Sequence, residues 1–278
     1  MLTVVFGASG NVGRHVAAGL NSVGAQVRLT SRSPDAAALP AGADVVFADL
    51  DRAETLPAAL DGAQRVFLYA KPEGIDGFVA AAESAGVQHV VLLSSAAVAT
   101  AATDNPIALI HSRVESALEA SRLAWTFIRP GMFASNTVRW WQEPIRGERT
   151  VRLPYPDART TPVHEKDLAA IALAALTEPG HEGRAYLAHG PEALTLRQQV
   201  RDIGAAIGRD ITVEESSVDQ ARAELEKTLP PFVAEAFLSG WKAAADEPPQ
   251  ISTTIEDVIG RPALTFAQWA RDHADDFR

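Results

Sequence analysis

The sequence predicts an α/β protein with a doubly wound parallel sheet and a smaller, mainly helical C-terminal subdomain. In the first two-thirds of the chain, short continuous apolar runs alternate with helical patterns, as in parallel sheets that helices cover on both faces. Gly24, Gly62 and Gly86 each fall between an expected helix and the next strand, where a left-handed helix terminus favours glycine. From Leu194 onward the pattern is mostly helical and more charged.

Each expected strand is a run of four or five residues that is mostly apolar, or alternates apolar and polar residues as in Gln26–Thr30, and the expected helices have amphipathic or apolar patterns. The expected strands are Leu2–Phe6, Gln26–Thr30, Val45–Ala48, Arg65–Tyr69, His89–Leu93, Trp125–Ile128 and Ala185–Ala188. The expected helices are Val12–Val23, Leu56–Leu60, Ile75–Ala85, Ile107–Ser121 and Glu165–Leu176. The alternation fails over residues 136–159, which hold Trp140, Trp141 and three prolines. We therefore expect residues 1–135 and 160–192 to form the sheet domain, and residues 136–159 and 193–278 the smaller subdomain.

Composition excludes several classes of function. The chain has 25 Lys and Arg against 35 Asp and Glu, a net charge of -10, which argues against nucleic acid and charged membranes as partners. The lack of cysteine excludes disulfides and thiolate chemistry, and no histidine pair has metal-ligand spacing, so we expect no metal site. The first strand begins almost at Met1, and the longest apolar run, Leu168–Leu176, is half of a membrane span. We expect a cytoplasmic protein.

The strongest motif is a glycine loop that follows the first strand and opens the first helix. Its sequence is Gly7-Ala8-Ser9-Gly10-Asn11-Val12-Gly13. The first glycine permits a tight turn, Gly10 lets the backbone approach a pyrophosphate, and Gly13 lets helix and strand pack closely. The N-terminus of the helix then offers free N–H groups to the phosphate charge. This context predicts a Rossmann dinucleotide site that Gly7, Ser9, Gly10, Asn11, Val12 and Gly13 form; the alternative is a strand–helix turn that binds nothing.

The second strand ends Thr30-Ser31-Arg32-Ser33, without the acid that usually accepts a hydrogen bond from the ribose 2′-hydroxyl of NAD. Arg32 suits a 2′-phosphate, so we expect NADPH, with NADH as second choice. The alternative is that Arg32 is a solvated turn residue.

The next two strands end in further candidates for nucleotide binding. Asp49 and Leu50 are placed to reach the adenine edge, although Asp49 suits a helix cap equally well. Tyr69, Ala70 and Lys71 are placed at the cofactor ribose, although a solvated loop position suits Lys71 nearly as well.

The Gly-x2-Gly-x2-Gly spacing, with Ser94-Ser95 downstream, resembles extended and atypical short-chain dehydrogenases, most of which use a Tyr-x3-Lys pair. That pair is absent: no lysine stands four residues after any of the three tyrosines. On the corresponding helix His111 and Glu115 take the two positions, and Ala96 stands where the catalytic hydroxyl is expected. Ser94 is then a candidate cofactor residue. His111 is the candidate catalytic acid, against a purely structural role, and Glu115 either orients the imidazole or merely pairs with it.

Four segments together resemble the NmrA-like family of atypical short-chain dehydrogenases. They are Gly7–Gly13, His111-x3-Glu115-x2-Leu118, Leu123–Phe133 and Gly260-Arg261-Pro262-x2-Thr265-Phe266-x2-Trp269-Ala270. The family includes quinone oxidoreductases, azoreductase-like enzymes and nitrogen-metabolite regulators, so the resemblance implies fold and cofactor more firmly than activity.

The resemblance implies an acceptor pocket beyond the sixth strand. Met132 and Phe133 are expected to line it, with Trp140 and Trp141 as part of an apolar roof; ordinary packing is the alternative for each residue. The leading hypothesis is an NADPH-dependent oxidoreductase that reduces a small electron-poor carbonyl compound such as a quinone or enone. The alternatives are a non-catalytic NADP(H) sensor acting through a protein partner and, more weakly, nucleotide-sugar epimerase chemistry. The sequence allows a homodimer without requiring one.

Overall fold

The computed structural model describes residues 1–34, 39–40, 42–100, 105–247, 249 and 251–278. The chain forms two compact units. Unit 1 comprises Met1–Pro130 and Glu165–Ala188, and unit 2 comprises Gly131–His164 and His189–Arg278. The predicted domain boundaries were residues 135/136, 159/160 and 192/193, a few residues from these divisions.

Unit 1 is built on one sheet of seven parallel strands, which confirms the predicted fold class. The sheet order is β3-β2-β1-β4-β5-β6-β9. The strands are β1 (Leu2–Val5), β2 (Gln26–Ser31), β3 (Asp44–Phe47), β4 (Ala63–Tyr69), β5 (His89–Leu93), β6 (Ala124–Pro130) and β9 (Arg184–Ala188).

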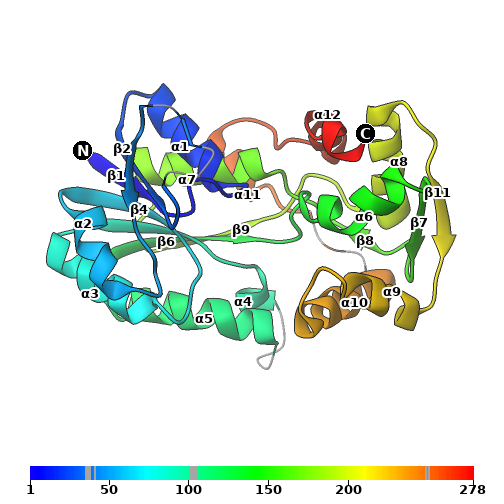
Figure 1. Cartoon of the computed structure of the whole chain (residues 1–278), viewed down its shortest axis with the longest axis horizontal. Coiled ribbons are helices and arrows are strands. Elements are labelled where there is room, and N and C mark those ends of the chain that lie inside the picture. The colour runs from blue at the N-terminus through cyan, green and yellow to red at the C-terminus, as the bar shows by residue number, and fades with distance from the viewer. Residues whose placement is uncertain (35–38, 41, 101–104, 248, 250) are drawn as a thin grey trace. The chain divides into compact units, whose positions relative to one another are not determined.

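Helices cover both faces of this sheet. They are α1 (Gly13–Ser22), α2 (Leu56–Leu60), α3 (Ile75–Ala85), α4 (Ala97–Thr100), α5 (Pro106–Glu119) and α7 (Glu165–Thr177), with a 3-10 turn, η1, at Ala53–Thr55. Figure 1 shows α1 and α7 on one face and α2, α3 and α5 on the other. Because both faces are covered, strand residues such as Val4, Val66 and Val90 are fully buried, which explains the continuous apolar runs.

Local sequence fixes where these helices begin and end. Gly24, Gly62 and Gly86 all adopt the predicted positive φ, between 71° and 75°. The side chain of Asn105 caps α5 by accepting hydrogen bonds from the N–H groups of Ile107 and Ala108, and Pro106 occupies the first helical position.

The sheet reverses its direction of strand addition at β1, which lies between β2 and β4. Ligands of open α/β sheets bind beyond the carboxyl ends of the strands at such a switch point. The glycine loop follows β1, and Tyr69 is the last residue of β4, so both reach this edge of unit 1. The fold thus places the predicted nucleotide residues at the expected edge.

Unit 2 contains the remaining elements, most of them helices. They are α6 (Asn136–Arg146), β7 (Thr150–Leu153), β8 (Arg159–Thr160), β10 (Leu194–Thr195), α8 (Leu196–Ile207), β11 (Thr212–Glu215), α9 (Val218–Leu225), α10 (Pro231–Asp246), α11 (Thr254–Ile259), α12 (Phe266–Asp272) and the 3-10 turn η2 (Ala274–Phe277). Strands β7 and β11 pair in parallel, and β8 and β10 pair antiparallel. Its core gathers aromatic rings, with Trp269 stacked on Phe266 at 5.1 Å between ring centroids.

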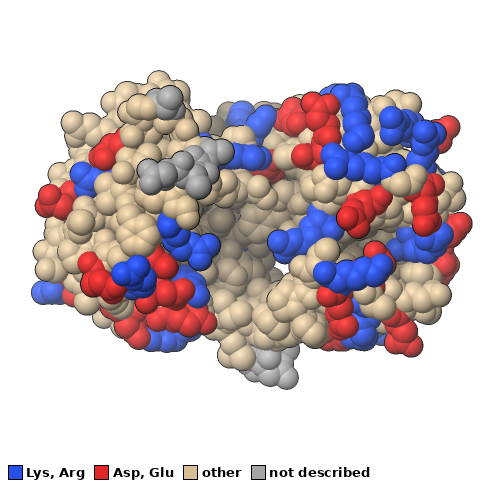
Figure 2. All heavy atoms as spheres, in the orientation of Figure 1, with Lys and Arg blue, Asp and Glu red and all other residues tan. Residues whose placement is uncertain are grey.

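Two further observations describe the chain as a whole. No helix among the described residues combines the length and the apolar composition that crossing a bilayer requires. On the face seen in Figure 2, acidic and basic side chains are interspersed.

Candidate functional site

The glycine loop forms a tight turn at the end of β1. Gly7 adopts φ +70°, and its carbonyl accepts a hydrogen bond of 2.9 Å from the N–H of Gly10. The ring of Tyr69 lies directly behind the turn, since a Cβ atom on Gly7 would lie 3.0 Å from Tyr69 Cδ1. Both the positive φ and this close ring require glycine at position 7.

Gly13 allows the first turn of α1 to sit against the loop. A Cβ atom here would lie 2.1 Å from the carbonyl oxygen of Gly7, which is backbone and cannot move aside cheaply. A Cβ on Gly10 would lie 3.1 Å from the same oxygen. Gly7 and Gly13 therefore have the turn and packing geometry that the spacing predicted, and the approach of a pyrophosphate to Gly10 stays a prediction.

The N-terminus of α1 presents free backbone N–H groups. Val12 occupies the N-cap position, and no side chain caps the helix. Within the described part of the chain, the N–H groups of Asn11, Val12 and Gly13 have no backbone acceptor, whereas the N–H of Arg14 bonds to Gly10 O at 3.1 Å. Ser9, Gly10 and Asn11 are exposed. Open amides at a helix N-terminus, reached over side-chain-free backbone, fit the pyrophosphate of a dinucleotide.

The end of β2 carries an available cation. The N–H of Ser33 donates to the hydroxyl of Ser31 at 3.0 Å, which shapes the turn that holds Arg32. Arg32 is exposed, and the described residues offer it no ion-pair partner. Its charge acts to lower the pKa of Tyr69, although burial outweighs it and the net pKa of that phenol is raised.

The charged side chains that follow β3 and β4 form hydrogen bonds and ion pairs within this part of the edge. The carboxylate of Asp49 accepts a hydrogen bond from the N–H of Asp51 at 3.1 Å, so it shapes a turn, and the N-cap of the following 3-10 turn is Arg52 instead. Lys71 Nζ lies 3.1 Å from Glu73 and 3.2 Å from Asp51, and these acids raise its pKa.

Neighbouring residues complete this part of the edge. Leu50 is buried, and its carbonyl leaves room only for glycine at position 74, where a Cβ would lie 2.1 Å from that oxygen. Ala70 follows Tyr69 and is half-buried. All thirteen predicted nucleotide residues belong to unit 1. Their contact with nucleotide stays a prediction.

A buried polar network joins β5, α5 and β6. Ser94 Oγ donates to Glu115 Oε1 at 2.6 Å, and Arg129 binds the same carboxylate with two contacts, 2.9 Å from Nε and 2.6 Å from Nη2. The Glu115 side chain is 4% exposed and that of Arg129 19%. The pairing with Glu115 raises the pKa of Arg129. Such a fork of charge-assisted hydrogen bonds fixes both side chains.

This network changes the expectation for His111. The sequence paired Glu115 with His111 by helical spacing, whereas the structure gives Glu115 to Ser94 and Arg129. His111 Nδ1 is buried and has no hydrogen-bond partner among the described residues. Burial lowers the pKa of His111, and the negative charge of Glu115 opposes this only partly. Burial therefore favours the neutral form of the His111 imidazole.

The four residues predicted to bind the acceptor belong to unit 2. Met132 and Phe133 lie on a strand-like segment beside Val163, which donates its N–H to Met132 O at 2.8 Å. Trp140 and Trp141 are 7% and 2% exposed and pack in the core of unit 2. They also line a cavity that unit 2 forms by itself.

The interaction that sequence reasoning missed is the Arg129 fork. The sequence shows Arg129 only as part of the family segment Leu123–Phe133 and indicates no partner for it. The available signal was a glutamate on the buried face of an amphipathic helix, since a buried carboxylate requires a counter-charge.

Comparisons with known proteins agree with this geometry. A family model described as NAD(P)H-binding matches residues 7–179, which is more than half of the chain. The chain belongs to this NAD(P)H-binding family. Its match begins at the first glycine of the loop, so the turn described above is part of what the family shares.

Several relatives of the chain are reductases or oxidoreductases. One, from Streptomyces griseus subsp. griseus, is (4-alkanoyl-5-oxo-2,5-dihydrofuran-3-yl)methyl phosphate reductase, 39% identical over 99% of each chain. The NAD(P)H azoreductase of Xenophilus azovorans is 32% identical over 85% of this chain and 84% of its own. The NADPH complex of the quinone oxidoreductase QOR2 from Escherichia coli has a TM-score of 0.83 and 25% identity, covering 98% of this chain and 99% of that one. These findings confirm the resemblance to NmrA-like atypical short-chain dehydrogenases and make the chain an NAD(P)H-dependent oxidoreductase.

Proposed function

We propose that the protein transfers hydride from NADPH to a small electron-poor carbonyl compound, with enones and quinones as the favoured classes. The preference for NADPH is supported by Arg32, an exposed guanidinium without an ion pair among the described residues, at the end of a β2 strand that carries no acid. A guanidinium binds a ribose 2′-phosphate with two parallel hydrogen bonds.

The hydrogen bonding of Glu115 and the protonation of His111, both on α5, support the proposed class of acceptor. Glu115 is held by Ser94 and Arg129, so it is committed to a structural pair, and burial favours the neutral form of His111, whose Nδ1 has no partner among the described residues. A neutral imidazole is a weak acid and gives little help to the developing charge on a simple ketone. An acceptor that delocalises this charge needs less help, which favours a conjugated carbonyl compound.

The name of the Streptomyces relative supports the same class. A 4-alkanoyl-5-oxo-2,5-dihydrofuran has a ring carbon–carbon double bond conjugated with two carbonyl groups. NADPH, when bound, supplies the hydride. The acceptor gains a C–H bond at the double-bond carbon remote from the carbonyls, its π electron pair spreads onto the carbonyl oxygens, and a proton completes the reduction. We propose that the imidazole of His111 donates a hydrogen bond to one of these carbonyl oxygens.

Steady-state turnover tests this proposal. The oxidation of NADPH is followed at its absorbance band with an acyl dihydrofuranone, a p-quinone and cyclohexanone as a saturated control. We expect kcat/KM for the conjugated acceptors to exceed that for cyclohexanone by at least about 1000-fold, or roughly 4 kcal/mol of transition-state stabilisation. Equal rates with the saturated ketone would contradict the role given to charge delocalisation.

A further inference from the structure

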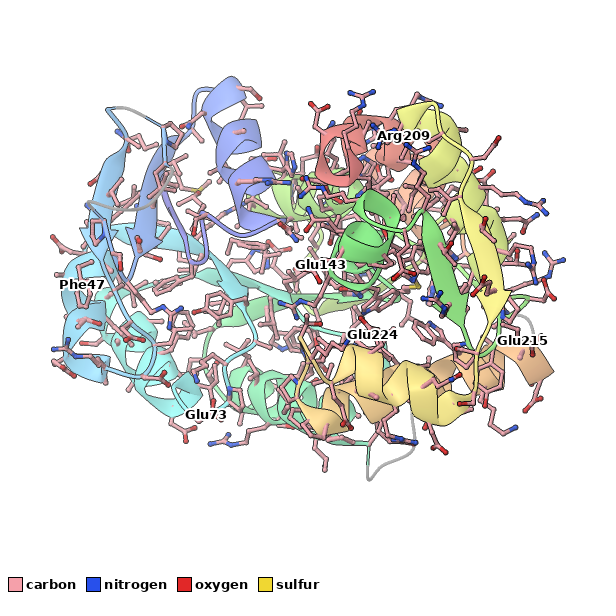
Figure 3. All side chains as sticks on the ribbon, turned by 45° about the vertical axis from the view of Figure 1, so that its right-hand side comes forward. Phe47, Glu73, Glu143, Arg209, Glu215 and Glu224 are labelled. Carbon is pink, nitrogen blue, oxygen red and sulfur yellow. The ribbon has the colours of Figure 1, made fainter. Side chains whose placement is uncertain are left out.

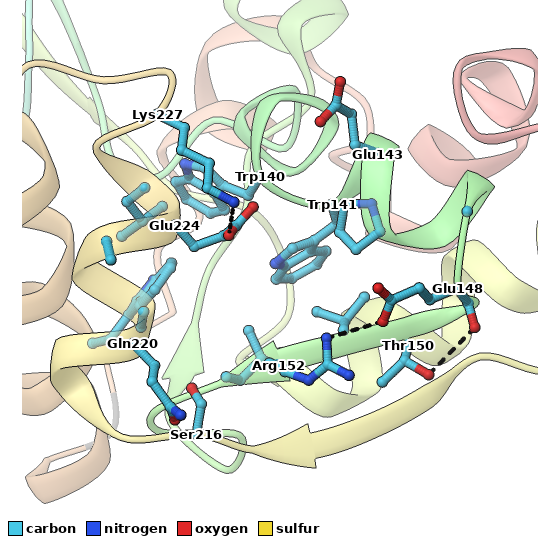
Figure 4. Close-up of a pocket in the computed structure, with 18 residues that line it drawn as sticks. Trp140, Trp141, Glu143, Glu148, Thr150, Arg152, Ser216, Gln220, Glu224 and Lys227 are labelled. Atoms are coloured by element: carbon cyan, nitrogen blue, oxygen red, sulfur yellow. Dashed lines mark hydrogen bonds and ion pairs between the residues drawn. The ribbon is translucent and has the colours of Figure 1, made fainter.

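Unit 2 forms a cavity of about 610 Å³ without any contribution from unit 1. Its walls come from the C-terminal half of α6, from β7, from α9 with the residue Ser216 before it, and from Trp241 of α10 (Figure 4). Pockets of roughly 300–1,000 Å³ hold small organic molecules in proteins. The volume is therefore sufficient for a compound of several fused rings.

The apolar wall of the cavity is aromatic and fixed. Trp140 and Trp141 come from α6, and the ring of Trp140 meets Trp241 edge-on, 5.1 Å between centroids, and Phe237 at 4.7 Å. These contacts keep the Trp140 ring in one orientation. Val151 and Leu153 add an aliphatic surface from β7. A rigid wall of this kind suits a planar aromatic ligand better than a flexible one.

The rim of the cavity is acidic. Three glutamates and two basic side chains line it: Glu143, Glu148, Glu224, Arg152 and Lys227. Both basic side chains already have partners. Arg152 lies 3.0 Å from Glu148 and 3.1 Å from Glu214, a residue outside the lining, and Lys227 lies 2.5 Å from Glu224.

Of the three glutamates that line the cavity, Glu143 is the one without a basic partner among the described residues. Figures 3 and 4 show it on α6, and within the described ranges it forms no ion pair. The negative charge of Glu143 reaches Lys227. Glu224 raises the pKa of Lys227 most, and Glu143 raises it to a smaller extent. Glu148 and Glu214 likewise raise the pKa of Arg152. The charged side chains that line the cavity sum to -1, and Glu214 beside Arg152 adds another negative charge, so a ligand at this rim meets a negative potential.

Two polar atoms of the lining residues have no hydrogen-bond partner. Trp140 Nε1 and Ser216 Oγ are both buried, and neither finds a partner among the described residues. Buried polar atoms are nearly always hydrogen-bonded in proteins, so such orphans call for an explanation. Trp140 is itself 7% exposed and lines the cavity. This observation is independent of the charge at the rim.

We propose that the cavity binds a planar aromatic cation, with Glu143 as its counter-charge and the exposed edge of Trp140 beside its ring. An anion would meet Glu143 without compensation, and a neutral ring would forgo the electrostatic attraction. The proposal concerns binding alone and stands whether or not the acceptor chemistry above is correct.

Fluorescence anisotropy of proflavine, a planar aromatic cation, tests the site in the full chain. Saturating NADP⁺ keeps the probe away from the glycine loop. Loss of one unit charge near a solvent-exposed ligand weakens binding by about fivefold, so Glu143→Gln should raise Kd by about that factor, whereas Glu178→Gln, an exposed control in unit 1, should not change it. Ala223→Trp fills the exposed edge of the cavity on α9 and should abolish binding.

A tryptophan at the exposed Ala243 of α10, which does not line the cavity, is the matched control for Ala223→Trp. Both substitutions are at exposed helical positions, and circular dichroism verifies that each variant is folded. Equal proflavine affinity in Ala223→Trp and Ala243→Trp would overturn the proposed site. Binding of 9-anthracenecarboxylate, an anion of similar shape, as tightly as proflavine would overturn the role of Glu143. Neither result depends on turnover, so both are distinguishable from a failure of the proposed reaction.

Discussion

Glu115→Gln removes the charge at the centre of the buried network while it keeps the shape of the side chain. The wild-type carboxylate accepts one hydrogen bond from Ser94 and two from Arg129. The amide retains one acceptor oxygen, and its NH2 group has to face either a guanidinium donor or the hydroxyl of Ser94. The guanidinium of Arg129 then stays in place with at most one of its two contacts.

The geometry sets the size of the effect. Removal of one partner of a buried ion pair costs about 3–5 kcal/mol. The Arg129 side chain is 19% exposed, so water compensates it in part, and we take the lower end, about 3 kcal/mol. For a domain of this size each kcal/mol lowers Tm by about 2–4 °C, so Tm should fall by about 6–12 °C.

Thermal and urea unfolding, followed by circular dichroism, measure this loss. Glu119→Gln is the matched control, because Glu119 is exposed on the same helix and no hydrogen bond or ion pair of its side chain is found among the described residues. We expect Glu119→Gln to change the free energy of unfolding by less than about 0.5 kcal/mol. If the two variants lose the same stability, Glu115 and Arg129 do not form the pair described above.

Three further predictions concern the nucleotide site and the sheet. Gly13→Ala places a methyl group 2.1 Å from Gly7 O, so calorimetry should find the Kd for NADPH raised by at least about 100-fold; unchanged affinity would show that the turn is not the nucleotide cradle. Arg32→Ala should weaken NADPH by about 10- to 100-fold and leave NADH unchanged, as expected for loss of a charge-assisted contact; an equal effect on both nucleotides would contradict its role at the 2′-phosphate. Burial lowers the pKa of His89 to about 4, and its Nδ1 has no partner among the described residues. The unfolded chain therefore binds the proton first as pH falls, and the free energy of unfolding should drop by about 3 kcal/mol between pH 6.5 and 4. His89→Gln should flatten that part of the profile, and a profile as steep as the wild type would refute this assignment.

The sheet was predictable because its signal is local. A continuous apolar run such as His89–Leu93 belongs to a covered parallel strand whatever its neighbours are, and β5 has those bounds. Strand β6 continues two residues beyond the expected Ile128, because Arg129 and Pro130 pair with Leu187 and Ala188 of β9. Pro130 is tolerated there since it is the last residue of the strand, and its carbonyl accepts a hydrogen bond from the N–H of Ala96.

The candidate site divides in the same way. The glycine loop was predictable because its steric requirements lie within seven residues, as the close approach of Gly13 to Gly7 shows. The partners of Glu115 were not predictable, because Ser94 and Arg129 lie 21 and 14 residues from it along the chain. The sheet brings them together. Helical spacing indicated only His111 as a partner of Glu115, because the two residues are four positions apart on the same helix.

Trp140 and Trp141 illustrate the limit of periodicity. Adjacent aromatic residues on one amphipathic helix indicate burial, but the side against which they pack depends on α10, about a hundred residues later. The place of Trp140 and Trp141 in an acceptor roof stays a prediction, and the structure shows both in a core that also walls a cavity.

The central claim is that a nucleotide held at the glycine loop gives its hydride to a conjugated carbonyl compound. NADPH carrying deuterium at the transferable C4 position, reacted with an acyl dihydrofuranone, tests this most directly by NMR of the product. We predict one deuterium at the former double-bond carbon remote from the carbonyls, in proportion to the NADPH consumed. A reduced product without deuterium, or tight NADPH binding with no product at all, would contradict the claim.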